Sequence, residues 1–163
     1  MVLDKDAPVG AKASEYFNIE EDYVYEIGLT PNRTDATSHI GVARDIVAVL
    51  NTRNNEKQKI NIPSVDGFKA QDKGSPIEVI VEDNEKCPRF SGLSIEGLEV
   101  KDSPDWLKNS LLAIGIRPVN NVVDITNYVL METGQPLHAY DISAIKGGKV
   151  IVRGANKGEK FTT

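Results

Sequence analysis

Cysteine and histidine are scarce in this chain of 163 residues. The one cysteine, Cys87, can form neither an intrachain disulfide nor a cysteine zinc cluster, which fits a reducing compartment. The two histidines, His39 and His138, are too few to indicate a metal site. The sequence therefore favours neither a disulfide-stabilised nor a zinc-binding class of protein, and we expect no metal.

An excess of positive charge and a long apolar run are missing as well. The formal net charge is −5 at pH 7, so the chain as a whole has no positive field for binding nucleic acid through counterion release. No apolar run approaches transmembrane length, and the N-terminus "MVLDKDAPVG" lacks the profile of a signal peptide. We therefore expect a soluble, cytoplasmic protein without a membrane partner, which contacts nucleic acid only through a local patch within a larger assembly.

The remaining composition is that of a globular protein, with 40% hydrophobic and 26% charged residues. A polar stretch broken by proline and glycine separates two patterned regions, which predicts a first unit at 1–52, a linker at 53–75 and a second unit at 76–163. Helical and strand-like patterns do not alternate regularly. We therefore predict an α+β fold, a layered mixed sheet with packed helices, preceded by a small, mainly helical domain.

Two stretches have helical spacing together with end signals. In "TSHIGVARDIVAVL" the apolar residues recur on one stripe, which we expect to be buried, and Ser38 or Thr37 is placed to cap the helix. In "SPDWLKNSLLAIG" Ser103 suits the N-cap, Pro104 the first helical position and Gly115 the C-terminal cap. The sequence thus predicts the ends of both helices.

Strand patterns lie on both sides of the second helix. In 77–82 the apolar residues at 77, 79 and 81 alternate with Glu78, Ile80 and Glu82, and 89–100 read as one or two further strands. The stretch "GGKVIVRGANKGEKFTT" reads as two strands about a turn. Because the last strand has no visible partner, we expect a piece of a longer protein.

The stretch "VVDITNYVLMETGQPLHAYD" at 122–141 places many polar side chains among apolar neighbours. We predict a helix at 125–133, with Asp124 as its cap and Gly134 as its end. The polar groups can cap and bridge local backbone, or they can line a pocket.

Taken singly, the polar residues of this region have ordinary structural explanations. Thr126 and Asn127 lie near a helix start and suit capping, and His138 follows a Gly-Gln-Pro turn whose backbone it can bond. Arg117 can brace loop carbonyls or face an anion. His39, at another helix start, reads as a polar surface or partly buried residue.

Taken together, "GIRPVNNVVDITNYVLMETGQPLHAYD" resembles the editing domain of the bacterial phenylalanyl-tRNA synthetase beta subunit. The resemblance continues through "WLKNSLLAIG" and "GGKVIVRGANKGEKFTT". The earlier "LTPNRTDATSHIGVARDIVAVLN" and "LDKDAPVGAKASEYF" resemble that subunit's first domain. Both blocks stand in the family's order, so the resemblance covers nearly the whole chain.

The resemblance implies an enzyme of two alpha and two beta subunits, which charges tRNA(Phe) with phenylalanine using ATP and Mg at the alpha subunit. The editing domain would hydrolyse tyrosine wrongly attached to the 3′ end of that tRNA, without a cofactor of its own. The family's catalytic pocket residues fall on His138, Thr126 and Asn127, and a substrate-binding residue falls on Arg117. Further pocket residues lie beyond position 163 in the family, which implies half an editing site with little or no activity.

Two alternatives stay open. In the first, Arg117, Asn127 and His138 form a buried polar network that fixes loops and docks the alpha subunit, without editing. In the second, the chain is a free-standing relative of the editing domain that acts on another aminoacyl-tRNA. The first-domain block argues against the second alternative, because a stand-alone hydrolase does not need a synthetase scaffold helix.

Overall fold

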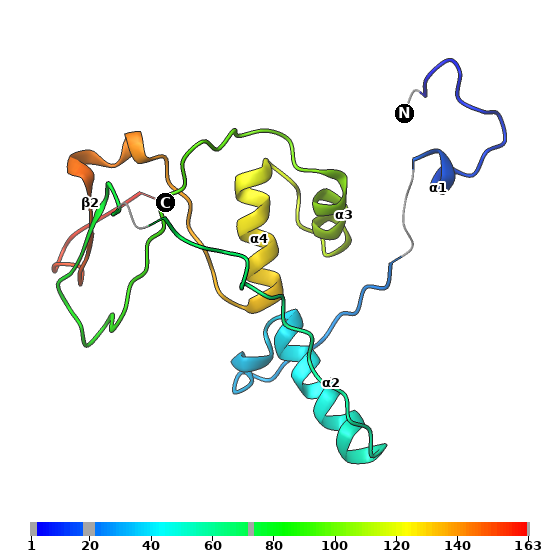
Figure 1. Cartoon of the computed structure of the whole chain (residues 1–163), viewed down its shortest axis with the longest axis horizontal. Coiled ribbons are helices and arrows are strands. Elements are labelled where there is room, and N and C mark those ends of the chain that lie inside the picture. Colours follow the sequence, from blue (N-terminus) through cyan, green and yellow to red (C-terminus); the bar gives the residue numbers. More distant parts are fainter. Residues whose placement is uncertain (1–2, 18–21, 72–73, 163) are drawn as a thin grey trace.

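The computed structural model describes residues 3–17, 22–71 and 74–162. Within these ranges the fold is α+β, with four helices and a two-stranded sheet (Figure 1). The helices are α1 (Ala13–Tyr16), α2 (His39–Arg53), α3 (Asp105–Ala113) and α4 (Asn121–Thr133), and the strands are β1 (Glu78–Val81) and β2 (Lys149–Val152). Short 3₁₀ helices are η1 (Thr34–Ala36), η2 (Ile142–Ala144) and η3 (Lys146–Gly148). None of the described helices is long and apolar enough to cross a membrane.

The sheet is smaller than the layered mixed sheet that the sequence predicts. β1 and β2 pair in parallel, with Glu78 opposite Lys149 and Val81 opposite Val152. Glu78 and Lys149 also form an ion pair at 2.9 Å. The chain between the strands contains α3 and α4, which provide the long crossover that a parallel pair needs.

The prediction of strands at 89–100 is wrong, as is that of a second strand after β2, because 153–162 contain none. Alternation of apolar and polar side chains is only half of what a strand requires. Its backbone N–H and C=O groups must also meet a neighbouring strand, and within the described chain these segments meet none. The β1 prediction is confirmed, since residues 78–81 lie inside the expected range.

The helix predicted in "TSHIGVARDIVAVL" is confirmed as α2. Ser38 caps it, because its Oγ accepts a hydrogen bond from the N–H of Gly41 at 3.0 Å. The apolar stripe is only half-buried, and within α2 just Gly41 is buried. Gly41 packs so closely on η1 that an added Cβ would lie 2.4 Å from the carbonyl oxygen of Asp35.

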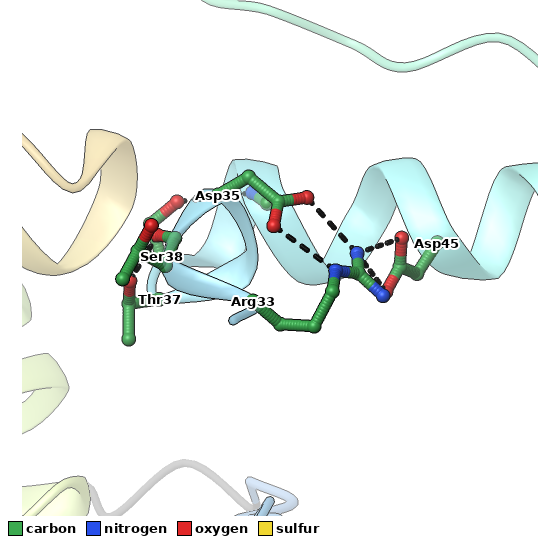
Figure 2. A network of polar contacts seen from close by, with 7 residues as sticks. Arg33, Asp35, Thr37, Ser38 and Asp45 are labelled. Carbon is green, nitrogen blue, oxygen red and sulfur yellow. Dashed lines mark hydrogen bonds and ion pairs between the residues drawn. The ribbon is translucent and has the colours of Figure 1, made fainter. Parts of the chain in front are cut away.

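An ion-pair cluster fixes the segment before α2. The guanidinium of Arg33 lies between the carboxylates of Asp35 and Asp45 (Figure 2). Its Nη2 donates to both, at 2.9 Å to Asp35 and 2.8 Å to Asp45. The hydrogen bond to Asp35 is the largest cause that raises the pKa of Arg33, and the same bond lowers the pKa of Asp35. Arg33 thereby ties η1 to the second turn of α2.

The core lies between α3 and α4, where Leu107 and Leu111 are buried. α3 begins at Asp105 with Pro104 at the N-cap, so the predicted cap at Ser103 is wrong by one residue. The hydroxyl of Ser103 donates to the carboxylate of Asp124 instead, which is a stronger acceptor than a neutral group.

The predicted end of α3 at Gly115 is confirmed. Gly115 has φ +78°, a left-handed conformation that favours glycine. The N–H groups of Gly115 and Ile116 donate to the carbonyls of Leu112 and Leu111, at 3.0 and 2.9 Å. This is the paired bonding of a Schellman cap, which satisfies carbonyls that a helix end otherwise leaves free.

Candidate functional site

The helix that carries the predicted site is one turn longer than the sequence indicates. α4 begins at Asn121, and its cap is Asn120, whose Oδ1 accepts from the N–H groups of Val122 and Val123 at 3.1 and 3.0 Å. The predicted cap at Asp124 is therefore wrong. The predicted end at Gly134 is confirmed, with φ +79° and an N–H that donates to Leu130 at 2.8 Å.

Asp124 joins the first turn of α4 to the chain around α3. Its side chain is fully buried at 0% exposure. One carboxylate oxygen accepts from Ser103 Oγ at 2.5 Å, and the other accepts from the N–H of Val119 at 2.8 Å. A buried carboxylate is tolerated only where donors satisfy it, and these two bonds supply that satisfaction. Asp124 thus holds the loop that carries Arg117 against the helix pair.

The four predicted site residues lie on three consecutive parts of the chain. Arg117 is exposed in the loop before α4, Thr126 and Asn127 are half-buried on α4, and His138 is exposed in the segment after it. The hydroxyl of Thr126 donates to the carbonyl of Val123 at 2.7 Å. This bond uses the only proton of the hydroxyl but leaves a lone pair free to accept another hydrogen bond.

Polar contacts do not join the four residues. In the described part of the chain, no hydrogen bond or ion pair links any two of them. The ring of His138 lies next to that of Tyr140, with centroids 6.5 Å apart and planes tilted by 33°. Arg117 and His138 flank the two ends of α4, a helix of 13 residues and therefore about 20 Å long. Their assignment to one substrate site stays a prediction.

The question raised by the polar stretch 122–141 has a partial structural answer. Asp124, Thr126, Thr133 and Asp141 all bond neighbouring backbone or side chains. Asp141 accepts from the hydroxyl and N–H of Ser143 at 2.7 and 2.9 Å, which lowers its pKa. These four residues bridge local structure, as the structural explanation expects. Among the described contacts, the side chains of Asn127 and His138 have no hydrogen-bond partner.

A pocket of about 190 Å³ lies at the junction of α2, α3 and α4. None of the four predicted residues lines it. Thr126 and Tyr128, two apart on α4, are separated by about 200° around the helix axis. Thr126 therefore lies on the side of α4 away from this pocket. The lining residues are His39, Ser110, Leu111, Ile114, Tyr128, Met131 and Glu132.

His39, which the sequence predicts as a polar surface or partly buried residue, is exposed and lies at this junction. Its Nδ1 lies 3.0 Å from the carbonyl oxygen of Met131, 92 positions later in the chain. Because a carbonyl oxygen can only accept, the imidazole must carry its proton on Nδ1. No local pattern predicts a pairing at that separation. Tyr128 and Met131 are three residues apart on α4 and therefore lie on the same face of the helix. This spacing is the signal in the sequence for the wall of the pocket that α4 forms.

The carboxylate of Glu159, a few residues after β2, is held by specific donors. Arg153 Nη1 donates to Glu159 Oε2 at 2.9 Å, and its Nη2 donates to Oε1. The N–H of Asn156 also donates to Glu159, at 2.9 Å. The hydrogen bond from Arg153, followed by that from Asn156, lowers the pKa of Glu159 to about 2.

No group of three or more His, Cys, Asp or Glu side chains suited to a metal ion occurs in the described ranges.

Comparison with known proteins gives a consistent set of relatives. Residues 86–163 match the B3/4 domain family, and this range contains all four predicted site residues. The whole chain is 50% identical to a phenylalanine–tRNA ligase beta subunit of Bacteroides thetaiotaomicron. It is 52% identical to that of Porphyromonas gingivalis and 45% identical, over 167 residues, to that of Geobacter metallireducens. The chain spans 20% of the length of each of these relatives.

Proposed function

We propose that this chain serves the editing of mischarged tRNA, because residues 86–163 match the B3/4 domain family and the whole chain is similar to a segment of phenylalanine–tRNA ligase beta subunits. In the intact ligase, residues 76–163 are the N-terminal part of a domain that hydrolyses tyrosine wrongly esterified to tRNA(Phe). The observation that carries this proposal is identity of about half over the full chain, including the helix with Thr126 and Asn127.

The need for such a step follows from the chemistry of the two amino acids. Tyrosine differs from phenylalanine by one hydroxyl, and an apolar pocket rejects an added hydroxyl by only about a hundredfold. A second site that hydrogen-bonds the hydroxyl selects tyrosine far better, because phenylalanine would leave the polar groups of that site unpaired. A ligase of this specificity gains accuracy from a separate hydrolytic site.

The described side chains suit this role in different ways. Arg117 is exposed and presents a guanidinium that can bind the terminal phosphate or ribose of the tRNA. Because the hydroxyl proton of Thr126 is used by Val123, Thr126 can only accept a hydrogen bond from a ligand, and a ribose hydroxyl would supply the donor. Asn127 can donate and accept, and would hold the terminal adenosine or the ester.

His138 would orient the substrate or the attacking water. Water adds to the ester carbonyl, and the bond between the carbonyl carbon and the ribose oxygen breaks. Tyrosine leaves as the free acid, and the ribose oxygen regains a proton. In the described chain no carboxylate is hydrogen-bonded to His138, so positioning of water beside the ester and the free ribose hydroxyl is favoured over general-base catalysis by this imidazole.

The proposed assembly is that of a heterotetramer of two alpha and two beta subunits, in the cytoplasm. The alpha subunit would bind ATP and Mg and attach phenylalanine, while this part of the beta subunit would bind the 3′ end of tRNA(Phe) and use no cofactor. We propose in addition that β1 and β2 are part of a layered mixed sheet in the intact subunit. Parallel strands normally have more partners than the single one that each strand has here.

The test uses the full-length beta subunit in complex with its alpha subunit. His138→Ala and Thr126→Trp are each expected to slow deacylation of tyrosyl-tRNA(Phe) by about a hundredfold, the first by loss of positioning and the second by blocking the site. Charging with phenylalanine should change by less than about twofold. Ile125→Trp, on the neighbouring exposed residue, is the matched control. Deacylation that survives both substitutions would exclude the proposed role of these residues.

A second candidate is a structural and assembly module that docks the alpha subunit without editing. The bonds of Asp124 and Thr126 to nearby groups favour it, since they show polar side chains in a bracing role. Here His138→Ala and Thr126→Trp would weaken association of the two subunits and leave deacylation intact. Analytical ultracentrifugation of the same variants distinguishes the two candidates.

A further inference from the structure

α2 and α4 meet end to end, with the N-terminus of α2 against the C-terminus of α4 (Figure 1). Two observations define this junction. The Nδ1 of His39, the first residue of α2, is 3.0 Å from the carbonyl oxygen of Met131 in the last turn of α4. A Cβ added to Gly134 would lie 3.4 Å from the Cβ of Ser38 and 3.5 Å from the carbonyl oxygen of Thr37.

The imidazole of His39 satisfies a group that the helix itself leaves free. The last four carbonyls of a helix have no partner within the helix. In α4, Gly134 takes the carbonyl of Leu130, and His39 takes that of Met131. His39 is therefore a side-chain cap supplied from a distant part of the sequence. It fixes the last turn of α4 relative to α2.

The chain leaves α4 at this junction and reaches His138 four residues after Gly134. The direction of that segment depends on the last turn of α4 and on the left-handed conformation of Gly134, both of which are in contact with α2. A small rotation of the last turn would move His138 relative to Thr126 and Asn127. Misplacement of a reacting group by about 1 Å is sufficient to lower a rate strongly.

We propose that His39 is a positioning residue for the deacylation step: its Nδ1–H bond to Met131 couples the scaffold helix α2 to the segment that carries His138. The inference rests on the proposed editing function. His39 touches neither substrate nor water in this role. It also lines the pocket at the junction of α2, α3 and α4. A substitution of His39 therefore changes a side chain at the pocket wall and does not disturb a closed core.

The test compares four variants of the full-length beta subunit in complex with the alpha subunit. His39→Leu keeps a side chain of similar size and removes the donor, while His39→Asn keeps an N–H donor on the atom bonded to Cγ, as in histidine. Arg44→Leu makes the same kind of change at an exposed position of α2 and serves as the matched control. His138→Ala reports on the proposed function itself.

For His39→Leu we expect kcat for tyrosyl-tRNA deacylation to fall about fivefold, the value of one ordinary hydrogen bond. KM and the charging rate with phenylalanine should stay within about twofold of the wild type. His39→Asn should restore most of the lost kcat, and Arg44→Leu should have no effect.

Three results would overturn the inference while leaving the proposed function in place, provided His138→Ala is inactive in deacylation. They are an unchanged kcat in His39→Leu, equal loss in His39→Leu and His39→Asn, or parallel loss of charging and deacylation. The last would indicate a purely structural role. Full deacylation by His138→Ala would instead remove the proposed function on which the inference depends.

Discussion

The α3–α4 helix pair and the β1–β2 strand pair differ in how many of their side chains are buried. The helices bury Leu107, Leu111 and Asp124, and Asp124 has hydrogen-bond donors at both carboxylate oxygens. In the strands no residue is buried. Apolar side chains stay exposed on the strands and on the segment before α3, at Val79, Phe90, Leu93, Ile95, Leu98, Val100 and Ile151.

The difference follows from how each element satisfies its backbone. A helix bonds its own N–H and C=O groups, so two helices can form a small core once their apolar faces meet. A strand needs neighbours, and each described strand has one. Two-stranded sheets are marginal alone, and parallel strands are normally covered on both faces. We therefore expect the stability of the described chain to reside in the helix pair.

The largest expected effect is at the centre of the helix pair. Leu111→Ala removes a side chain with 0% exposure and should lower the free energy of unfolding by about 3 kcal/mol. Leu112→Ala, the adjacent residue at 57% exposure, is the matched control and should cost less than about 1 kcal/mol. Urea unfolding followed by circular dichroism measures both. Equal costs at the two positions would mean that the helix pair has no specific core.

The next effect concerns the buried carboxylate. Asp124→Asn replaces an acceptor by an amide, which cannot accept from both Ser103 and the N–H of Val119. An unsatisfied buried donor costs about 2 kcal/mol, and we expect a loss of this size in the same unfolding experiment. Asp105→Asn, an exposed acidic residue in the first turn of α3, should change stability by less than about 0.5 kcal/mol. A neutral Asp124→Asn would show that the α3–α4 loop is held by other contacts.

A smaller effect is expected in the strand pair. Ile151→Ala removes an apolar side chain that is 50% exposed, so the free energy of unfolding should fall by less than about 1 kcal/mol. Amide hydrogen exchange sharpens the comparison, because β2 amides should exchange faster than those of α4. A cost as large as that of Leu111→Ala would reverse the assignment of stability to the helices.

The smallest effect is a pH dependence at the end of the chain. The pKa of Glu159 is lowered from its ordinary value of 4.5 to about 2. The carboxylate therefore stays ionised and bonded to Arg153 at pH values well below 4.5. A lowered pKa gives a contribution that is fully present above 4.5 and is lost only as the pH falls through about 2. The Asn156 amide, which donates to Glu159, should therefore keep its NMR shift on acidification to about pH 3. Movement of this shift with a midpoint near 4.5 would contradict the bonded geometry.

Local signals in the sequence predicted the features that depend on neighbouring residues. Ser38 caps α2, and Gly115 and Gly134 end α3 and α4, because capping and left-handed glycine act within one helical turn. The sequence predicts Ser103 and Asp124 as caps, but they bond each other across 21 positions. Ser103 thus donates to a distant carboxylate and does not accept from a nearby backbone N–H as a cap would, and sequence spacing does not indicate a partner at that separation.

In the candidate site, too, local features could be predicted from the sequence and distant contacts could not. The helix carrying Thr126 and Asn127 could be predicted from its apolar spacing and its terminal glycine. The contact of His39 with α4 could not, since it joins residues 92 positions apart. The strands predicted at 89–100 are absent from the structure because apolar alternation without a partner strand does not form a ladder. The grouping of Arg117, Thr126, Asn127 and His138 in one site rests on family resemblance and not on their contacts.

The most direct test of that grouping is to map where the 3′ end of the tRNA binds. A photoreactive adenosine at the 3′ terminus of tRNA(Phe), bound to the intact ligase and crosslinked, can be located on the beta subunit by mass spectrometry. Editing at this site predicts adducts within residues 117–138, which disappear when excess tyrosyl-tRNA(Phe) competes. Adducts that fall only outside that range, and resist the competitor, would contradict it.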